Sequence, residues 1–156
     1  MDDLTHLNAQ GDIRMVDVTD KQATLRVASA EGKIFLQHRT LKKLKNDALP
    51  KGNVFTTAKI AGILAAKKTS KLVPLCHQLN LSHVDLEFKI SNDHVRIIST
   101  VKTKEATGVE MEALTAVSVA ALSIYDMCKA VDRGICIDGI RVILKKGGRS
   151  GEIIST

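Results

Sequence analysis

Two acidic residues on one predicted helix are the first candidates for chemistry in this chain. Residues 107–129 are almost wholly apolar, with Glu112 near the start, Asp126 near the end and no charged residue from 113 to 125. A carboxylate at the start of a helix is ordinary helix-end chemistry, because it complements the helix dipole, whereas a carboxylate near the end opposes it. A charge at the end of a mostly buried helix also needs a partner. Asp126 is therefore the first pointer to a site.

The spacing along this helix predicts which side chains share a surface. Six apolar residues recur three and four apart, as an inward-facing stripe requires: Leu114, Val117, Ala121, Ile124, Cys128 and Val131. A second stripe carries Glu112 and Asp126, whose side chains lie within ~40° of one face but ~21 Å apart along the axis. The two carboxylates cannot share a pocket within one chain. If both serve one site, the simplest arrangement is a two-fold interface between two copies.

The rest of the chain reads as one α+β domain that positions this helix. Alternating apolar residues predict strands at 32–38, 79–90, 94–103 and 135–144, with a bulge near His83 and a hairpin joining the middle two strands. Residues 56–69 predict a second long helix, and 40–49 a short basic helix or turn that Pro50 ends. This order predicts a ferredoxin-like β-α-β-β-α-β fold, two helices packed on a four-stranded antiparallel sheet. We expect a single domain over 1–156, with an N-terminal arm at 1–30 and a Gly-rich basic tail at 145–156.

Composition predicts the cellular compartment of the protein and the kind of partner that it binds. The 156 residues are 44% hydrophobic and 26% charged, which is typical of one globular domain. The polar start predicts no secretory signal, and no apolar run predicts a membrane span. Three cysteines without a C-x-x-C pair predict reduced thiols in a cytoplasm and no structural metal. The net charge of +6 predicts an anionic partner, and with one Tyr, three Phe and no Trp a small phosphorylated ligand fits better than nucleic acid.

Several short segments could bind or react with such a ligand, although each has an ordinary explanation. Lys51 sits on a constrained loop between Pro50 and Gly52, where a lysine is usually only solvated. The segment LVPLCHQL places His77 where a helix gives way to a strand, and His77 could be an ordinary hydrogen-bonded histidine. The segment KKGGRSG predicts an anion nest with Lys145, Lys146 and Arg149, or else a disordered basic tail. It does not fit the P-loop pattern.

Taken together, the segments resemble a known family. The stretches LTHLN, MVDVTDK, KGNVFTTAKIAGILAAKKTSKLVPLCH, TGVEMEALTAVSVAALSIYDMCKAV and KKGGRSG run in order along nearly the whole chain. They resemble the cyclic pyranopterin monophosphate synthases, also called the molybdenum cofactor biosynthesis protein C family. The resemblance implies a lyase that converts (8S)-3',8-cyclo-7,8-dihydroguanosine 5'-triphosphate to cyclic pyranopterin monophosphate and releases pyrophosphate. It implies no redox step and no cofactor, and leaves open whether Mg²⁺ accompanies the triphosphate.

The resemblance also implies roles for particular residues. Asp126 matches the catalytic aspartate, a general acid/base, and Lys51 and Lys129 match lysines of the chemistry, which could carry protons if a neighbouring positive charge or burial lowered their pKa. The substrate ring would be bound by Leu75, Cys76, His77, Glu110, Met111, Glu112 and Met127. The triphosphate would be received by Lys21, Arg26, Lys67 and Lys145. Family members assemble as hexamers, trimers of dimers, with sites between chains.

Two other classes of function stay open at this point. An RNA-binding ferredoxin-like module would explain the fold and the charge. A non-catalytic nucleotide-binding subunit would keep the phosphate-binding cations, but it would not need Asp126, Lys51 and Lys129 together.

Overall fold

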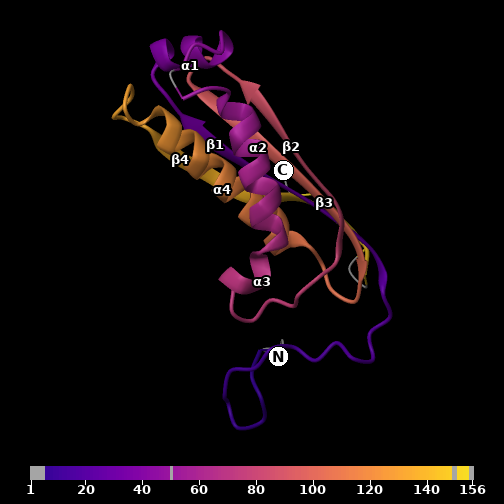
Figure 1. The fold of residues 1–156 in the computed structure, drawn as a ribbon. Coiled ribbons are helices and arrows are strands. Elements are labelled where there is room, and N and C mark those ends of the chain that lie inside the picture. Colours follow the sequence, from indigo (N-terminus) through magenta and orange to yellow (C-terminus); the bar gives the residue numbers. More distant parts are fainter. Residues whose placement is uncertain (1–5, 50, 149–150, 155–156) are drawn as a thin grey trace.

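A computed structural model describes residues 6–49, 51–148 and 151–154. In this part of the chain a twisted antiparallel sheet carries the helices on one face, and the N-terminal segment extends away from the layers before it enters the first strand (Figure 1). The elements follow in the order β1 (Thr24–Phe35), α1 (His38–Lys45), α2 (Val54–Lys67), α3 (Thr69–Leu72), β2 (Leu81–Ile90), β3 (His94–Glu105), α4 (Glu110–Cys128), β4 (Cys136–Lys146) and β5 (Glu152–Ile154).

The sheet has the strand order β2-β3-β1-β4-β5, and each strand is antiparallel to its neighbours. β1 is central and pairs with β3 along its whole length, from Thr24 opposite Glu105 to Phe35 opposite His94. The predicted hairpin is confirmed as β2–β3, and the predicted bulge is confirmed as a register shift between Leu81 and His83. The α+β class and the antiparallel sheet are therefore as predicted.

The core lies between the sheet and a layer formed by α2 and α4. The predicted apolar stripe of α4 is confirmed at Val117, Ala121, Ile124 and Cys128, which have no exposed surface. Small residues let the layers approach closely: a Cβ on Gly62 of α2 would meet the Leu86 side chain and the α4 backbone. Among the described residues, α4 alone is long and apolar enough to cross a membrane by composition, but it is the core helix of this domain.

The predicted limits of the first strand and of the N-terminal arm are wrong. β1 begins at Thr24, so residues 24–30 belong to the central strand rather than to an arm. Its inward positions include Ala28, Ala30 and Gly32, because α4 packs closely there: a Cβ on Gly32 would meet the Val117 side chain. Such small residues give little hydropathy alternation.

The predicted four-strand count and the predicted tail are also wrong. β4 continues to Lys146 and β5 returns beside it, so the sheet has five strands in the described part of the chain. The glycines of the tail form the turn between them, and Gly147 has a positive φ of 97°. A three-residue strand whose side chains are all exposed leaves no periodic signal in the sequence.

Candidate functional site

The start of α4 forms one wall of a pocket of about 410 Å³. The other walls are the loop that follows α3 and the N-terminal segment that precedes β1. The lining includes six of the predicted substrate-binding residues, namely Leu75, Cys76, His77, Glu110, Met111 and Glu112. The N-terminal segment contributes His6, Val16, Val18 and Lys21, of which only Lys21 was predicted. We call this hollow the ring pocket.

His77 is held by the N-terminal segment. Its Nε2 lies 2.7 Å from the carbonyl oxygen of Val16. A carbonyl oxygen only accepts, so Nε2 carries the proton and donates, which leaves Nδ1 of the neutral ring as an acceptor. No local pattern predicts this contact, because the two residues are 61 positions apart.

Glu112 is the titratable group whose environment in the ring pocket differs most from water. It is 4% exposed, and burial, with a smaller contribution from the negative charge of Glu110, raises its pKa to about 6. Burial, and then the charge of Glu112, also raises the pKa of the Cys76 thiol. Glu112 can therefore donate or accept a hydrogen bond near neutral pH, whereas Cys76 stays a thiol.

A second pocket, of about 660 Å³, opens beside the first and contains cations. Lys21, Thr107 and Gly108 line both pockets, so the two hollows lie side by side. Arg26 and Lys145 also line the second one, together with one acidic residue, Asp20. We call this hollow the cation pocket, and three of the four predicted phosphate-binding residues lie in it.

The cations of this pocket are only partly satisfied within the chain. Lys145 forms an ion pair with Glu110. Arg26 donates from Nη2 to the carbonyl of Ala106 at 3.2 Å, but its Nε is buried without a hydrogen-bond partner. A side chain at Gly147 would collide with the backbone carbonyl of Leu25, so glycine lets the turn after β4 lie against β1 beside Arg26.

The structure does not place every predicted phosphate-binding residue in the cation pocket. Lys67 is the exposed last residue of α2 and does not line it. Lys146 pairs with Glu152 across the β4–β5 turn at 2.7 Å. Arg149 lies outside the described residues. Of the predicted anion nest, Lys145 and Gly148 line the pocket.

The three predicted catalytic residues meet at the opposite end of α4. Lys129 Nζ lies 2.7 Å from Asp126 Oδ1, and Lys51 Nζ lies 3.7 Å from Asp126 Oδ2. Lys51 also donates to the main-chain carbonyl of Asp126 at 3.1 Å. That carbonyl belongs to the last turn, where helix carbonyls lack intrahelical partners, so the two lysines offset the unfavourable position of a carboxylate there. We call these three residues the Asp126 cluster.

Proton transfer by lysine was predicted to need a lowered lysine pKa, and the Asp126 cluster of a single chain does not provide this. The hydrogen bond and charge of Lys129, and then the charge of Lys51, hold the pKa of Asp126 below its usual value. In return, Asp126 raises the pKa of Lys129. In a single chain Lys129 is therefore a stable cation rather than a lysine with a lowered pKa. Met127, which was predicted to bind the substrate ring, packs against the core and does not line the ring pocket.

α4 is one continuous helix, and this confirms the spacing argument. Glu112 lines the ring pocket at its start, and Asp126 belongs to the cluster near its end. Fourteen residues of helix separate them by ~21 Å. Within the described residues no group of three or more His, Cys, Asp or Glu side chains could hold a metal ion. The absence of a cofactor stays a prediction.

Comparisons with known proteins agree on one family. Residues 15–148 match the MoaC family. The chain is 55% identical over 152 residues to the cyclic pyranopterin monophosphate synthase of Chloroflexus aurantiacus, covering 96% of this chain and 93% of that one. It is 54% identical to the synthase of the same name from Roseiflexus sp., covering 99% of both.

A longer relative contains a similar region. The molybdenum cofactor biosynthesis bifunctional protein of Chlorobaculum tepidum is 57% identical over 148 residues, which are 95% of this chain and 47% of that protein. The chain thus spans about half the length of this relative.

Proposed function

Because this chain belongs to the MoaC family, we propose that it forms cyclic pyranopterin monophosphate, in an early step of molybdenum cofactor biosynthesis. The proposed substrate is (8S)-3',8-cyclo-7,8-dihydroguanosine 5'-triphosphate, and the other product is pyrophosphate. The reaction is that of a phosphorus–oxygen lyase and includes no redox step.

The observation that supports this proposal is that the ring pocket and the cation pocket are adjacent and share three lining residues. His77 and Glu112 present hydrogen-bonding groups suited to the amide edge of a guanine-derived ring. Lys21, Arg26 and Lys145 present positive charge suited to a triphosphate. Lys21, Thr107 and Gly108 lie where the two hollows meet. One molecule with a polar ring at one end and phosphates at the other fits this arrangement.

Binding of the triphosphate would change one existing contact. Glu110 now pairs with Lys145, and its carboxylate would be repelled by an incoming phosphate. We expect Lys145 to exchange this carboxylate for a phosphate oxygen. The buried Nε of Arg26, which lacks a partner, gains one in the same step if the side chain turns toward the phosphates.

The chemical step requires the Asp126 cluster, which the ring pocket of the same chain cannot reach. We propose that the end of α4 in one copy completes the pocket at the start of α4 in a second copy, within a trimer of dimers. Exposed apolar side chains on the outer helix surfaces, including Ile60 and Leu64 of α2 and Leu122 of α4, support burial against another copy. The partner's phosphate-binding cations would then lie near the cluster, and nearby positive charge lowers a lysine pKa.

The remaining predictions belong to this proposal. Mg²⁺ could accompany the triphosphate, and the enzyme would work in the cytoplasm without nucleic acid or membrane. The strand order β4-β1-β3-β2, with α2 and α4 on one face, supports the proposal of a ferredoxin-like core to which β5 adds an edge strand.

The structure offers little for the RNA-binding alternative. Sheet-type RNA modules stack bases on aromatic side chains of an open sheet face. Here Phe88 of β2 packs against Phe55 of α2, with ring centroids 5.1 Å apart, so it faces the helices. Phe35 packs against the ring of His94 at 5.3 Å.

One experiment tests the proposed function. The purified protein is incubated with the cyclic dihydroguanosine triphosphate, and a pterin product and pyrophosphate are measured together. We expect both to form in equal amounts and to be lost in Asp126→Asn. Tight RNA binding with no turnover of the cyclic nucleotide would instead favour the RNA-binding module.

A further inference from the structure

A buried carboxylate close to the Asp126 cluster has no role in the proposed reaction. Asp132 lies in the loop between α4 and β4 and is 1% exposed. Its Oδ2 accepts a hydrogen bond from the Gln37 N–H at 2.7 Å, and its Oδ1 accepts one from the Gly134 N–H at 3.1 Å. Within the described part of the chain it forms no ion pair. Burying a carboxylate without a cation is costly, and these two N–H groups offset that cost.

The contacts of Asp132 join two segments that are distant in sequence. Gln37 is the N-cap of α1, its side chain makes no capping bond, and the first turn of α1 has no acidic residue. Asp132 therefore supplies the negative charge that the start of a helix favours. Arg39 adds a second link, because its Nη2 donates to the Val131 carbonyl at 3.3 Å. The start of α1 is thus fastened to the segment that directly follows α4.

Both fastened segments lead to the Asp126 cluster. Lys129 precedes Asp132 by three residues, and Lys51 lies on the loop that follows α1. Lys51 contacts Asp126 across 75 residues of sequence, so the contact depends on how α1 is held against the end of α4. We propose that Asp132 is a positioning residue that sets the geometry of the Asp126 cluster by fastening α1 to the end of α4. Only the catalytic importance of that geometry rests on the proposed function.

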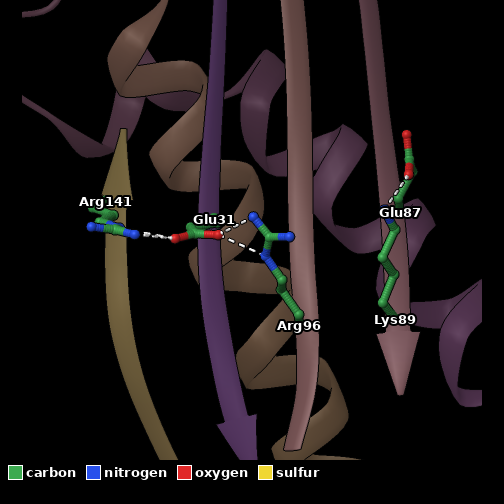
Figure 2. Close-up of polar contacts among 5 residues, drawn as sticks. All are labelled: Glu31, Glu87, Lys89, Arg96 and Arg141. Carbon is green, nitrogen blue, oxygen red and sulfur yellow. Dashed lines mark hydrogen bonds and ion pairs between the residues drawn. The ribbon is translucent and has the colours of Figure 1, made fainter. Parts of the chain in front are cut away.

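Glu31 provides a matched control for burial. It is 4% exposed and accepts hydrogen bonds from Arg96 Nε at 2.7 Å and from Arg141 Nε at 2.9 Å. Figure 2 shows this carboxylate joining β1 to β3 and β4 across the sheet. The next residue, Gly32, faces α4, so Glu31 points to the opposite face. Glu31→Gln removes a carboxylate that is about as buried as Asp132, but it changes no contact of α1 or of the loop after α4.

The direct test measures the pKa of Asp126 by NMR of protein labelled at the Asp carboxyl carbon. In Lys51→Met the pKa should rise by the share that Lys51 contributes, and in Asp132→Ala it should rise in the same direction. In Glu31→Gln it should stay at the wild-type value, although the thermal unfolding midpoint falls. Arg39→Ala removes only an exposed link and should give a smaller rise. If Asp132→Ala does not fold, Arg39→Ala decides the outcome.

Kinetics with the cyclic triphosphate complete the test. Asp132→Ala should lower kcat roughly tenfold to a hundredfold, the range expected when catalytic groups are misplaced, with little change in KM. Glu31→Gln should keep kcat. An unchanged Asp126 pKa in Asp132→Ala and Arg39→Ala would refute the positioning role, and so would equal losses of kcat in Asp132→Ala and Glu31→Gln. If the Asp126 pKa shifts in Asp132→Ala but the wild-type protein shows no turnover of the cyclic triphosphate, the positioning role stands and the proposed function is overturned.

Discussion

The two ends of α4 carry the same kind of group in opposite environments. Glu112 is 4% exposed, and burial raises its pKa to about 6. The side chain of Asp126 is 62% exposed, and its pKa is lowered, first by the hydrogen bond from Lys129. At the start of the helix desolvation outweighs every opposing influence, whereas at the end two lysines act on a carboxylate that water still reaches. One helix can therefore present a partly protonated acid and a fully ionised one at the same pH.

The difference also extends to how complete each region is. The N-terminal segment and the loop after α3 line the ring pocket together with Glu112, and the cation pocket lies beside it in the same chain. Asp126 lines neither of these two pockets, and its partners Lys51 and Lys129 are both about half exposed. A single chain thus carries the ring pocket at one end of α4 and the three predicted catalytic residues at the other. Predictions about these ends test whether they belong to one site.

The largest expected effect comes from the exposed end. Asp126→Asn should reduce kcat by roughly two to four orders of magnitude, the usual range for loss of a general acid/base. The fold and oligomer should persist, because the side chain is exposed and fills no core volume. Steady-state kinetics with circular dichroism and mass measurement check this. Turnover near the wild-type level would remove Asp126 from the chemistry.

Mixing two inactive variants tests whether the ends meet between chains. Glu112→Gln and Asp126→Asn should each be inactive alone, since every pocket then has one lesion. With free exchange of subunits about half the dimers are mixed, and one of their two pockets is intact. Activity should then approach roughly a quarter of wild type.

Exchange must be shown independently for that experiment, by mass spectrometry of differently tagged chains. Confirmed exchange without recovery would contradict the shared site, and one of the two carboxylates would then lie outside it.

The cation pocket should affect binding more than chemistry. Lys145→Ala and Arg26→Ala remove groups proposed to hold phosphates, so KM should rise while kcat changes little. The dependence of KM on salt should also weaken, because fewer ionic contacts remain to be screened. Kinetics at several ionic strengths measure both effects. A fall in kcat at constant KM would argue against a phosphate-binding role.

The smallest effect concerns stability and pH, and its sign differs between the two ends. A folded-state pKa of Glu112 near 6, above the usual 4.5, means that the folded protein binds more protons between these values. Stability from this group is present below about pH 4.5 and declines through pH 6, by about 2 kcal/mol in all. Asp126 has the opposite sign, since its lowered pKa makes its contribution disappear as pH falls.

Denaturant unfolding across pH 4 to 7 resolves these contributions as differences from matched variants. The free energy of unfolding of the wild type minus that of Glu112→Gln should fall with rising pH. The same difference for Asp126→Asn should not fall. Equal slopes would mean that burial does not set the behaviour of Glu112.

The sequence predicted the parts of this molecule that depend on periodicity. The inward stripe of α4, the β2–β3 hairpin and the separation of Glu112 from Asp126 all follow from helical or strand spacing, and the structure agrees. The start of β1 was missed because Ala28 and Ala30 are small where α4 packs closely, so hydropathy hardly alternates there.

Contacts between distant segments could not be predicted in the same way. The bond between His77 and Val16 and the tether from Asp132 to Gln37 join residues 61 and 95 positions apart, and no local pattern marks such pairs. Only the resemblance of long segments to a known family predicted which distant residues belong to one site. Their roles stay predictions, and of the predicted substrate-binding residues Lys67 and Met127 line neither the ring pocket nor the cation pocket.

The continuous run of α4 between Glu112 and Asp126 also limits which changes of length this protein can tolerate. Each residue added there turns the far end by ~100° and moves it by ~1.5 Å. Deleting or inserting one residue would therefore carry Asp126 to another side of the helix while every core contact beyond it also shifted. An insertion of seven would restore the direction but lengthen the span by ~10 Å, more than side chains could bridge. The length of α4 therefore fixes the distance between Glu112 and Asp126. The stretch between them should tolerate substitutions but no insertions or deletions.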